Sequence, residues 1–195
     1  MIKRYIELFA KYAGLVTICF EWLAAVLFYL VRPANFDGSS PISYFAYYPE
    51  TRIIFSVCLT VAATSFWIFA RFHLPKYYVV PVRMFTASMF GYALLALTPF
   101  DPNNFFSDTI HRILAMFFSL TFLAGIYLMG KHNKDSRVRA VSYGAVVLSA
   151  LVLFVFLATP KGSPFLLLLE VLSAFIGQLW TIWISFYSFK KAAAK

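Results

Sequence analysis

The sequence predicts an all-α membrane protein, a single domain over residues 1–195 built as a bundle of six transmembrane helices with both ends in the cytoplasm. Three observations support this prediction. The 195-residue chain is 62% hydrophobic and only 13% charged, which leaves too little polar surface to cover a soluble globule. Its apolar residues fall in six long runs separated by short polar segments. Its basic residues are divided unequally between the two sets of connecting segments.

Each of the six runs is long enough to cross a bilayer. A helix rises about 1.5 Å per residue, so roughly 20 apolar residues cross a hydrocarbon core about 30 Å thick. The predicted spans are 12–31, 53–70, 82–100, 110–129, 138–158 and 165–189. The second is the shortest, and the sixth is long enough to tilt or to project past the membrane.

The first run follows Lys3 and Arg4, as the core of a signal peptide does. It is longer than a usual signal core and carries Glu21 at its centre, so we expect a retained span. Turn signals such as Arg32-Pro33 and Thr98-Pro99 separate the runs. Because all the connections are short, we expect consecutive helices to be antiparallel neighbours.

The orientation follows from lysine and arginine. Thirteen of the seventeen basic residues fall on one side of the predicted membrane: Lys3, Arg4, Lys11, Arg71, Lys76, Arg83, Lys131, Lys134, Arg137, Arg139, Lys190, Lys191 and Lys195. Only Arg32, Arg52, Arg112 and Lys161 fall on the other side. The positive-inside rule makes the richer side cytoplasmic, and we expect a plasma (inner) membrane.

Several functional classes are disfavoured. The net charge of +9 does not indicate nucleic acid, because the basic residues lie at the ends of apolar runs and form no single stripe. Cys19 and Cys58 lie inside apolar runs and show no disulfide or zinc-ligand spacing. No phosphate-binding loop, nucleophile elbow or zinc-protease motif occurs. We therefore predict no cofactor and no metal.

Glu21 is the first candidate for function. A charged carboxylate midway through a span costs several kcal/mol unless it is protonated, paired or hydrated. It must therefore face the bundle interior or a wet cavity. Gly14, Thr17 and Ala25 share its helical face and make a small, polar stripe suited to close helix contact.

The sixth span carries a second polar stripe: Glu170, Ser173, Gly177, Gln178, Thr181 and Ser185. Gln178 should lie near the depth of Glu21. If the first and sixth spans are adjacent, a polar seam runs inward from the outer face. Two interpretations stay open: hydrogen bonds that join helices, or a ligand or substrate site.

The outer segments before the fourth span supply a third cluster, Asp101, Asp108, His111 and Arg112. Asp108 suits the first turn of a helix, and Arg112 is spaced to be its i+4 partner. Capping does not explain His111, which could respond to protons or contact a lipid headgroup. A metal is disfavoured, because the other histidines, His73 and His132, are predicted on the cytoplasmic side.

Two short motifs carry a family resemblance. Residues 41–52 lead directly into the second span, and Pro99-Phe100-Asp101 is followed by Ile110-His111. These segments, with the span count and topology, resemble the FRAG1/DRAM/Sfk1-like and DUF998 six-span membrane proteins. Tyr44-Phe45-Ala46 replaces the acidic-glycine pair usual in those families. The resemblance implies a lipid-associated membrane protein and does not imply a particular reaction.

The leading hypothesis is a protein without assigned catalysis that binds membrane lipid or another apolar small molecule in an outward-facing cleft. Its candidate ligand-binding residues are Glu21, Glu50, Arg52, Asp101, Asp108, His111, Arg112, Glu170 and Gln178. Two alternatives stay open. One is a lipid-modifying enzyme that uses a carboxylate and His111 as base and acid. The other is a proton-coupled transporter that uses Glu21 and Glu170 as relays.

Overall fold

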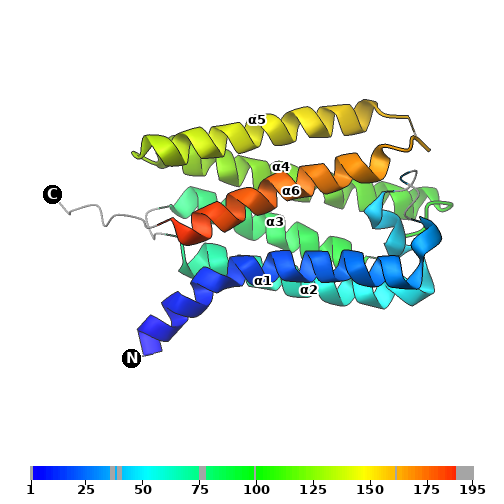
Figure 1. The fold of residues 1–195 in the computed structure, drawn as a ribbon, viewed down its shortest axis with the longest axis horizontal. Helices are drawn as coiled ribbons and strands as arrows, with labels where there is room; N and C mark the ends of the chain where they lie inside the picture. The colour runs from blue at the N-terminus through cyan, green and yellow to red at the C-terminus, as the bar shows by residue number, and fades with distance from the viewer. Residues whose placement is uncertain are drawn as a thin grey trace.

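The computed structural model describes residues 2–35, 38, 41–74, 78–98, 100–160 and 162–187, the side chains of residues 2–7 and 35 excepted. Within these residues the chain is all-α, with six helices and no strand (Figure 1). The helices are α1 (Ile2–Val31), α2 (Pro49–Phe72), α3 (Val79–Leu97), α4 (Phe105–His132), α5 (Ser136–Ala158) and α6 (Leu166–Phe186). Two short 3₁₀ helices, η1 (Pro33–Asn35) and η2 (Ile42–Ala46), lie between α1 and α2.

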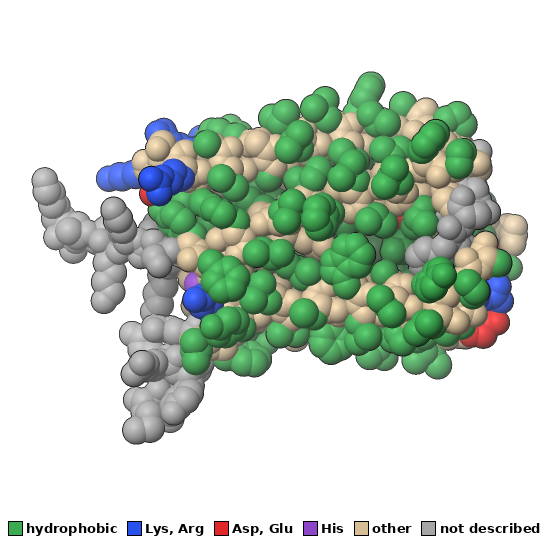
Figure 2. Space-filling model, viewed as in Figure 1, with side chains coloured by type: hydrophobic (Ala, Val, Ile, Leu, Met, Phe, Trp, Pro, Cys, Tyr) green, Lys and Arg blue, Asp and Glu red, His purple; other side chains and the backbone are tan. Residues whose placement is uncertain are grey.

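The helices form a closed ring. Each packs against the next along the chain, and α1 packs against α6 (Figure 1). All six are long and apolar enough to cross a membrane. On the face that Figure 2 shows, apolar side chains cover most of the described surface along the helices, as lipid contact requires. The predicted six-span, all-α architecture is confirmed.

Helix ends differ from the predicted boundaries where local chemistry sets them. The third helix ends three residues early, because Thr98, extended at ψ 126°, precedes a proline. The fourth begins early because the Asn104 side chain accepts hydrogen bonds from the amides of Phe106 and Ser107 at 3.0 and 3.2 Å. The second begins early at Pro49, a residue suited to a first helical position. Positions 188–189 of the predicted sixth span lie outside the described residues.

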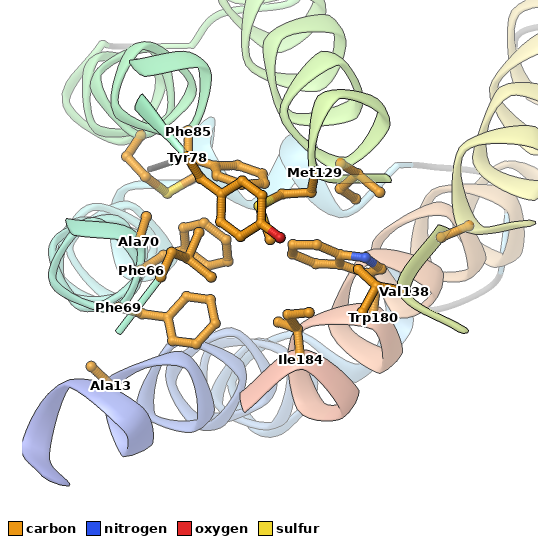
Figure 3. Close-up of a cluster of buried hydrophobic side chains, with 14 of the residues drawn as sticks. Ala13, Phe66, Phe69, Ala70, Tyr78, Phe85, Met129, Val138, Trp180 and Ile184 are labelled. Atoms are coloured by element: carbon orange, nitrogen blue, oxygen red, sulfur yellow. The ribbon is translucent and has the colours of Figure 1, made fainter. Parts of the chain in front are cut away.

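An aromatic core fills the end of the bundle where α1 begins and α6 ends, which we call the terminal end. Side chains from several helices converge there (Figure 3). The Phe85 ring lies 5.5 Å from Phe66 and 5.6 Å from Trp180, centroid to centroid. Gly125 of α4 lets the Phe85 ring approach, since a Cβ there would lie 2.5 Å from a Phe85 carbon. The helices are therefore tightly packed at this end.

A second, smaller core lies at the opposite end, which we call the η2 end. There the Phe28 ring of α1 stacks on Phe45 of η2, with centroids 4.6 Å apart. Phe55 of α2 joins the stack at 6.2 Å from Phe28. Because the two cores occupy opposite ends, the middle of the ring between them can hold open space.

The turn between α4 and α5 is fastened to the end of α6. Asp135 caps α5 by accepting a hydrogen bond from the Arg137 amide at 2.8 Å, and it also accepts one from the Tyr187 hydroxyl. The Tyr187 hydroxyl and the Arg137 amide together hold the pKa of Asp135 below its ordinary value. This capping also explains why α5 begins two residues before its predicted start.

Candidate functional site

A cavity of about 580 Å³ lies inside the ring. All six helices and η2 line it, and most of the lining side chains are apolar. Phe66 and Phe122, whose rings lie 5.3 Å apart, separate it from the aromatic core at the terminal end. Its volume falls in the range of about 300–1,000 Å³ that is usual for small-molecule sites.

The cavity opens between α1 and α6. Trp22 of α1 lines it and is 43% exposed, and Ala174 of α6 lines it and is exposed as well. Figure 2 shows this face, where the surface is hollowed between the two helices toward the η2 end. The opening therefore faces the region that lipid would occupy.

A hydrogen-bond network crosses the cavity at the depth of Glu21. The Tyr92 hydroxyl donates to Glu21 Oε1 at 3.0 Å, and Gln178 Nε2 donates to Glu21 Oε2 at 2.7 Å. Trp22 Nε1 donates to Gln178 Oε1 at 2.9 Å. The network joins α1, α3 and α6 and supplies donors to a carboxylate in mid-span. It confirms that Glu21 and Gln178 share a depth, and it favours the hydrogen-bonding interpretation for these two residues.

The small residues on the same face of α1 as Glu21 also contact neighbouring helices. A Cβ at Gly14 would lie 2.9 Å from Ser185 Oγ, so the backbone of α1 closely approaches α6 there. Thr17 Oγ1 donates to the Ala62 carbonyl of α2 at 3.1 Å. The sequence left the adjacency of the first and sixth spans as a condition; in the structure the two helices are neighbours, and their contact closes the ring.

Glu170 lies nearer the η2 end. Its carboxylate accepts hydrogen bonds from the backbone amides of Ile42 and Ser43 at the start of η2. It precedes Gln178 by eight residues, about 12 Å along a helix. The cavity therefore has two polar levels, one around Glu21 and one around Glu170.

His111 belongs to the level of Glu170. It lies six residues after the start of α4, and Glu170 lies four residues after the start of α6 at the same end of the bundle. His111 lines the cavity and is only 4% exposed, yet neither ring nitrogen has a hydrogen-bond partner among the described residues. Its ring lies 4.4 Å from Phe100, which in turn lies 5.4 Å from Tyr44. An imidazole so placed has an unused donor and an unused acceptor.

The predicted ion pair of α4 is present at the edge of the cavity. Arg112 Nε lies 2.9 Å from Asp108 Oδ2, with the two side chains 55% and 21% exposed. Both residues line the cavity. Asp108 also lies in the first turn of α4, as expected. An ion pair this exposed contributes little to stability.

Three residues predicted at the mouth do not line the cavity that the described residues enclose: Glu50, Arg52 and Asp101. Glu50 instead pairs with Arg32 at 2.9 Å on the surface, and Arg52 is exposed. Asp101 accepts the Asn103 amide at 2.9 Å within its own turn.

The other two histidines lie far from His111. His73 follows α2 at the terminal end, where its Nε2 lies 3.4 Å from the Ile184 carbonyl. His132 is the last residue of α4, 21 residues after His111 and so about 32 Å away along the helix. His73 and His132 are therefore remote from the polar level that contains His111.

Sequence reasoning missed two members of the site, Trp22 and Tyr92. Both are aromatic residues in a chain that is 20% aromatic, where most rings indicate lipid contact or helix packing. Trp22 directly follows Glu21, which is the one signal that could have drawn attention to it. Tyr92 shows no comparable signal, because it lies on a different helix.

Comparison with known proteins gives one match. Residues 13–187 match the sequence model of the DUF998 family, which is described as "Protein of unknown function". No curated protein and no solved structure matches the chain. The matched segment covers nearly all of the six-helix ring and every residue of the cavity lining. The chain is a six-helix integral membrane protein that belongs to the DUF998 family.

Proposed function

We propose that this protein binds an amphiphilic molecule taken from the surrounding membrane. The polar head would lie beside Glu170 and His111, and the apolar body would fill the cavity. The observation that carries the proposal is the cavity of about 580 Å³, apolar in most of its lining, with a buried histidine at its polar end that has no hydrogen-bond partner among the described residues.

Two physical arguments support an occupant. An empty apolar cavity forfeits the dispersion contacts that its lining would otherwise make. Neither ring nitrogen of His111 is hydrogen-bonded to another residue that the structure describes, and a buried polar group left unsatisfied costs about 1–3 kcal/mol. An amphiphile supplies both kinds of contact at once. The opening between α1 and α6 lets such a molecule enter from the bilayer.

The lipid-modifying alternative lacks an assembled pair of groups. No carboxylate is hydrogen-bonded to His111 among the described residues, whereas a general base and its partner normally lie within hydrogen-bond reach. Binding needs only the cavity and its polar end, so it is the simpler proposal. The resemblance to the lipid-linked FRAG1/DRAM/Sfk1-like proteins agrees with a lipid or lipid-like ligand.

We also propose that the chain lies in a plasma membrane with both ends in the cytoplasm and the η2 end outside. The unequal distribution of lysine and arginine supports this orientation. In Figure 2 the Lys and Arg side chains gather mainly at the terminal end of the bundle. The polar level of Glu170 and His111 would then lie near the outer headgroups.

Native mass spectrometry of gently extracted protein tests the binding proposal. Ala115→Phe and Ala174→Phe each add a ring to a residue that lines the cavity. Ala150→Phe adds the same ring to an exposed position of α5 outside the cavity lining and is the matched control. We expect a retained molecule in the wild type and in Ala150→Phe, and less of it in the two cavity variants. His111→Ala should weaken retention as well.

The proposal fails if the wild type carries no bound molecule under gentle conditions. It also fails if the cavity variants, folded as judged by circular dichroism, retain as much ligand as Ala150→Phe. Either result would mean that the cavity is not a binding site.

A further inference from the structure

We infer that the head of the ligand carries an ammonium group, which lies between Glu170, His111 and the aromatic rings of Tyr44 and Phe100. The inference rests on the proposed function and adds the chemical class of the ligand. It is argued from the acidic and basic side chains that line the cavity and from the hydrogen bonds and ion pairs that these side chains already make.

The cavity lining contains more acidic than basic side chains. It contains three carboxylates, Glu21, Glu170 and Asp108, and one guanidinium, Arg112. Arg112 is already paired with Asp108. Neither Glu21 nor Glu170 has an ion-pair partner in the part of the chain that the structure describes. A carboxylate without a counter-ion at membrane depth is costly, and a cationic ligand would supply the missing charge.

Glu170 is the more available of the two carboxylates. Both oxygens of Glu21 accept hydrogen bonds from side chains that are themselves fixed on α3 and α6. Among the described residues, Glu170 accepts hydrogen bonds only from backbone amides, and a carboxylate offers about four lone-pair positions in all. Its remaining positions can accept hydrogen bonds from an ammonium group.

The surroundings of Glu170 suit the same group. The unpartnered imidazole of His111, when neutral, offers a nitrogen that can accept an N–H hydrogen bond. Tyr44 and Phe100 both line the cavity and lie edge to face, and the faces of aromatic rings attract cations. An anionic head would instead meet an uncompensated carboxylate. The features at this level therefore favour a cation over an anion.

Three amphiphiles with the same tail test the charge of the head: dodecylamine, dodecanol and dodecyl phosphate. Each is titrated at pH 7 into the protein in a non-ionic detergent, and bound ligand is counted by native mass spectrometry. We expect dodecylamine to bind most tightly. Glu170→Gln keeps an acceptor for the η2 amides but removes the charge. It should therefore reduce the preference for dodecylamine over dodecanol about tenfold or more, as expected for loss of a charge-assisted hydrogen bond.

Glu50→Gln is the matched control, because it makes the same substitution at the same end of the bundle outside the cavity lining. It should leave the preference unchanged. Continued binding of dodecanol by Glu170→Gln would show that the variant is folded and that its cavity is intact.

The results separate this inference from the proposed function. If dodecanol or dodecyl phosphate binds as tightly as dodecylamine, the ammonium inference is wrong and the binding function stands. If none of the three binds and the purified protein carries no molecule, both are wrong. An unchanged preference in Glu170→Gln also overturns the inference.

The ammonium could belong to a lipid or to a free amine. Nanodiscs of equal parts phosphatidylethanolamine and phosphatidylglycerol distinguish these sources once dodecylamine binding is established. Enrichment of phosphatidylethanolamine on the protein assigns the site to an aminolipid headgroup. Retention of neither lipid assigns it to a free amphiphilic amine, whereas equal retention of the two lipids contradicts a preference for an ammonium head.

Discussion

Replacing Gly125 by alanine should destabilise the bundle, although alanine is the better helix former. A Cβ at this position would lie 2.5, 2.7 and 2.9 Å from three carbons of the Phe85 ring, closer than van der Waals contact allows. Phe85 is fully buried against Phe66, Phe122 and Trp180, so its ring has little room to move. Overpacking of this kind costs about 1–3 kcal/mol.

The matched control is Gly144→Ala. Gly144 lies in the middle of α5 and would place its Cβ in open space, with no atom within 4 Å. Both substitutions gain about 1 kcal/mol of helix propensity, and only Gly125→Ala incurs the clash. We therefore expect Gly125→Ala to be less stable than Gly144→Ala by about 1–3 kcal/mol, the cost of the overpacking.

Unfolding by sodium dodecyl sulfate in mixed micelles, followed by circular dichroism, measures the difference. Phe85→Leu in the Gly125→Ala background should recover part of the loss, because the smaller side chain removes the clash. Equal stability of Gly125→Ala and Gly144→Ala would refute the close packing of α3 against α4 at this level.

Three further predictions follow from contacts described above. In a double-mutant cycle of Trp22→Phe and Gln178→Leu, the coupling free energy should be about 0.6–1.7 kcal/mol, the range for hydrogen bonds between membrane helices. A value near zero would show that the hydrogen bond between Trp22 and Gln178 contributes nothing to stability. The lowered pKa of Asp135 should add stability that is present above the ordinary carboxyl pKa of about 3.9 and is lost as the pH falls through the lower folded value. The free energy of unfolding of Asp135→Asn, measured as the pH is lowered, should lack this loss. If the variant and the wild type lose stability identically in acid, the stabilising role of Asp135 is contradicted. In intact cells, a membrane-impermeant maleimide should label Asn103→Cys and not Lys134→Cys in a cysteine-free background, and the reverse pattern would invert the proposed orientation.

The fold was largely predictable because it depends mainly on the length and spacing of the apolar runs, which can be read directly from the sequence. Hydrocarbon excludes unpaired backbone groups, so each long apolar run must form a helix, and short connections make consecutive helices neighbours. The match of Glu21 with Gln178 was also predictable, since both lie at the middle of their runs. The DUF998 membership inferred from short motifs is confirmed, whereas the relationship to FRAG1/DRAM/Sfk1-like proteins stays a prediction.

The cavity and its polar end were harder to predict. Backbone amides hold Glu170, and they leave no trace in the residue types around them. Glu50 lies in the first turn of α2 and Asp101 in the turn before α4, where the hydrophobic pattern does not specify side-chain partners. Glu50 pairs with Arg32 and Asp101 bonds within its own turn, both away from the cavity. His111 attracted attention because capping did not explain it, and it is buried without a partner. The volume of the cavity depends on how six helices lean on one another, which periodicity does not encode.

The contact between the first and last helices has a consequence for biosynthesis. Because α1 meets α6, the cavity inside the ring is complete only after α6 has left the ribosome and entered the bilayer. Until then Glu21 of α1 lacks its hydrogen-bond partner Gln178 on α6, and the ring of helices beside it is still open. An early translation stop that removes α6 would leave that acid group without this partner in the middle of the bilayer, where an unpaired polar group is costly.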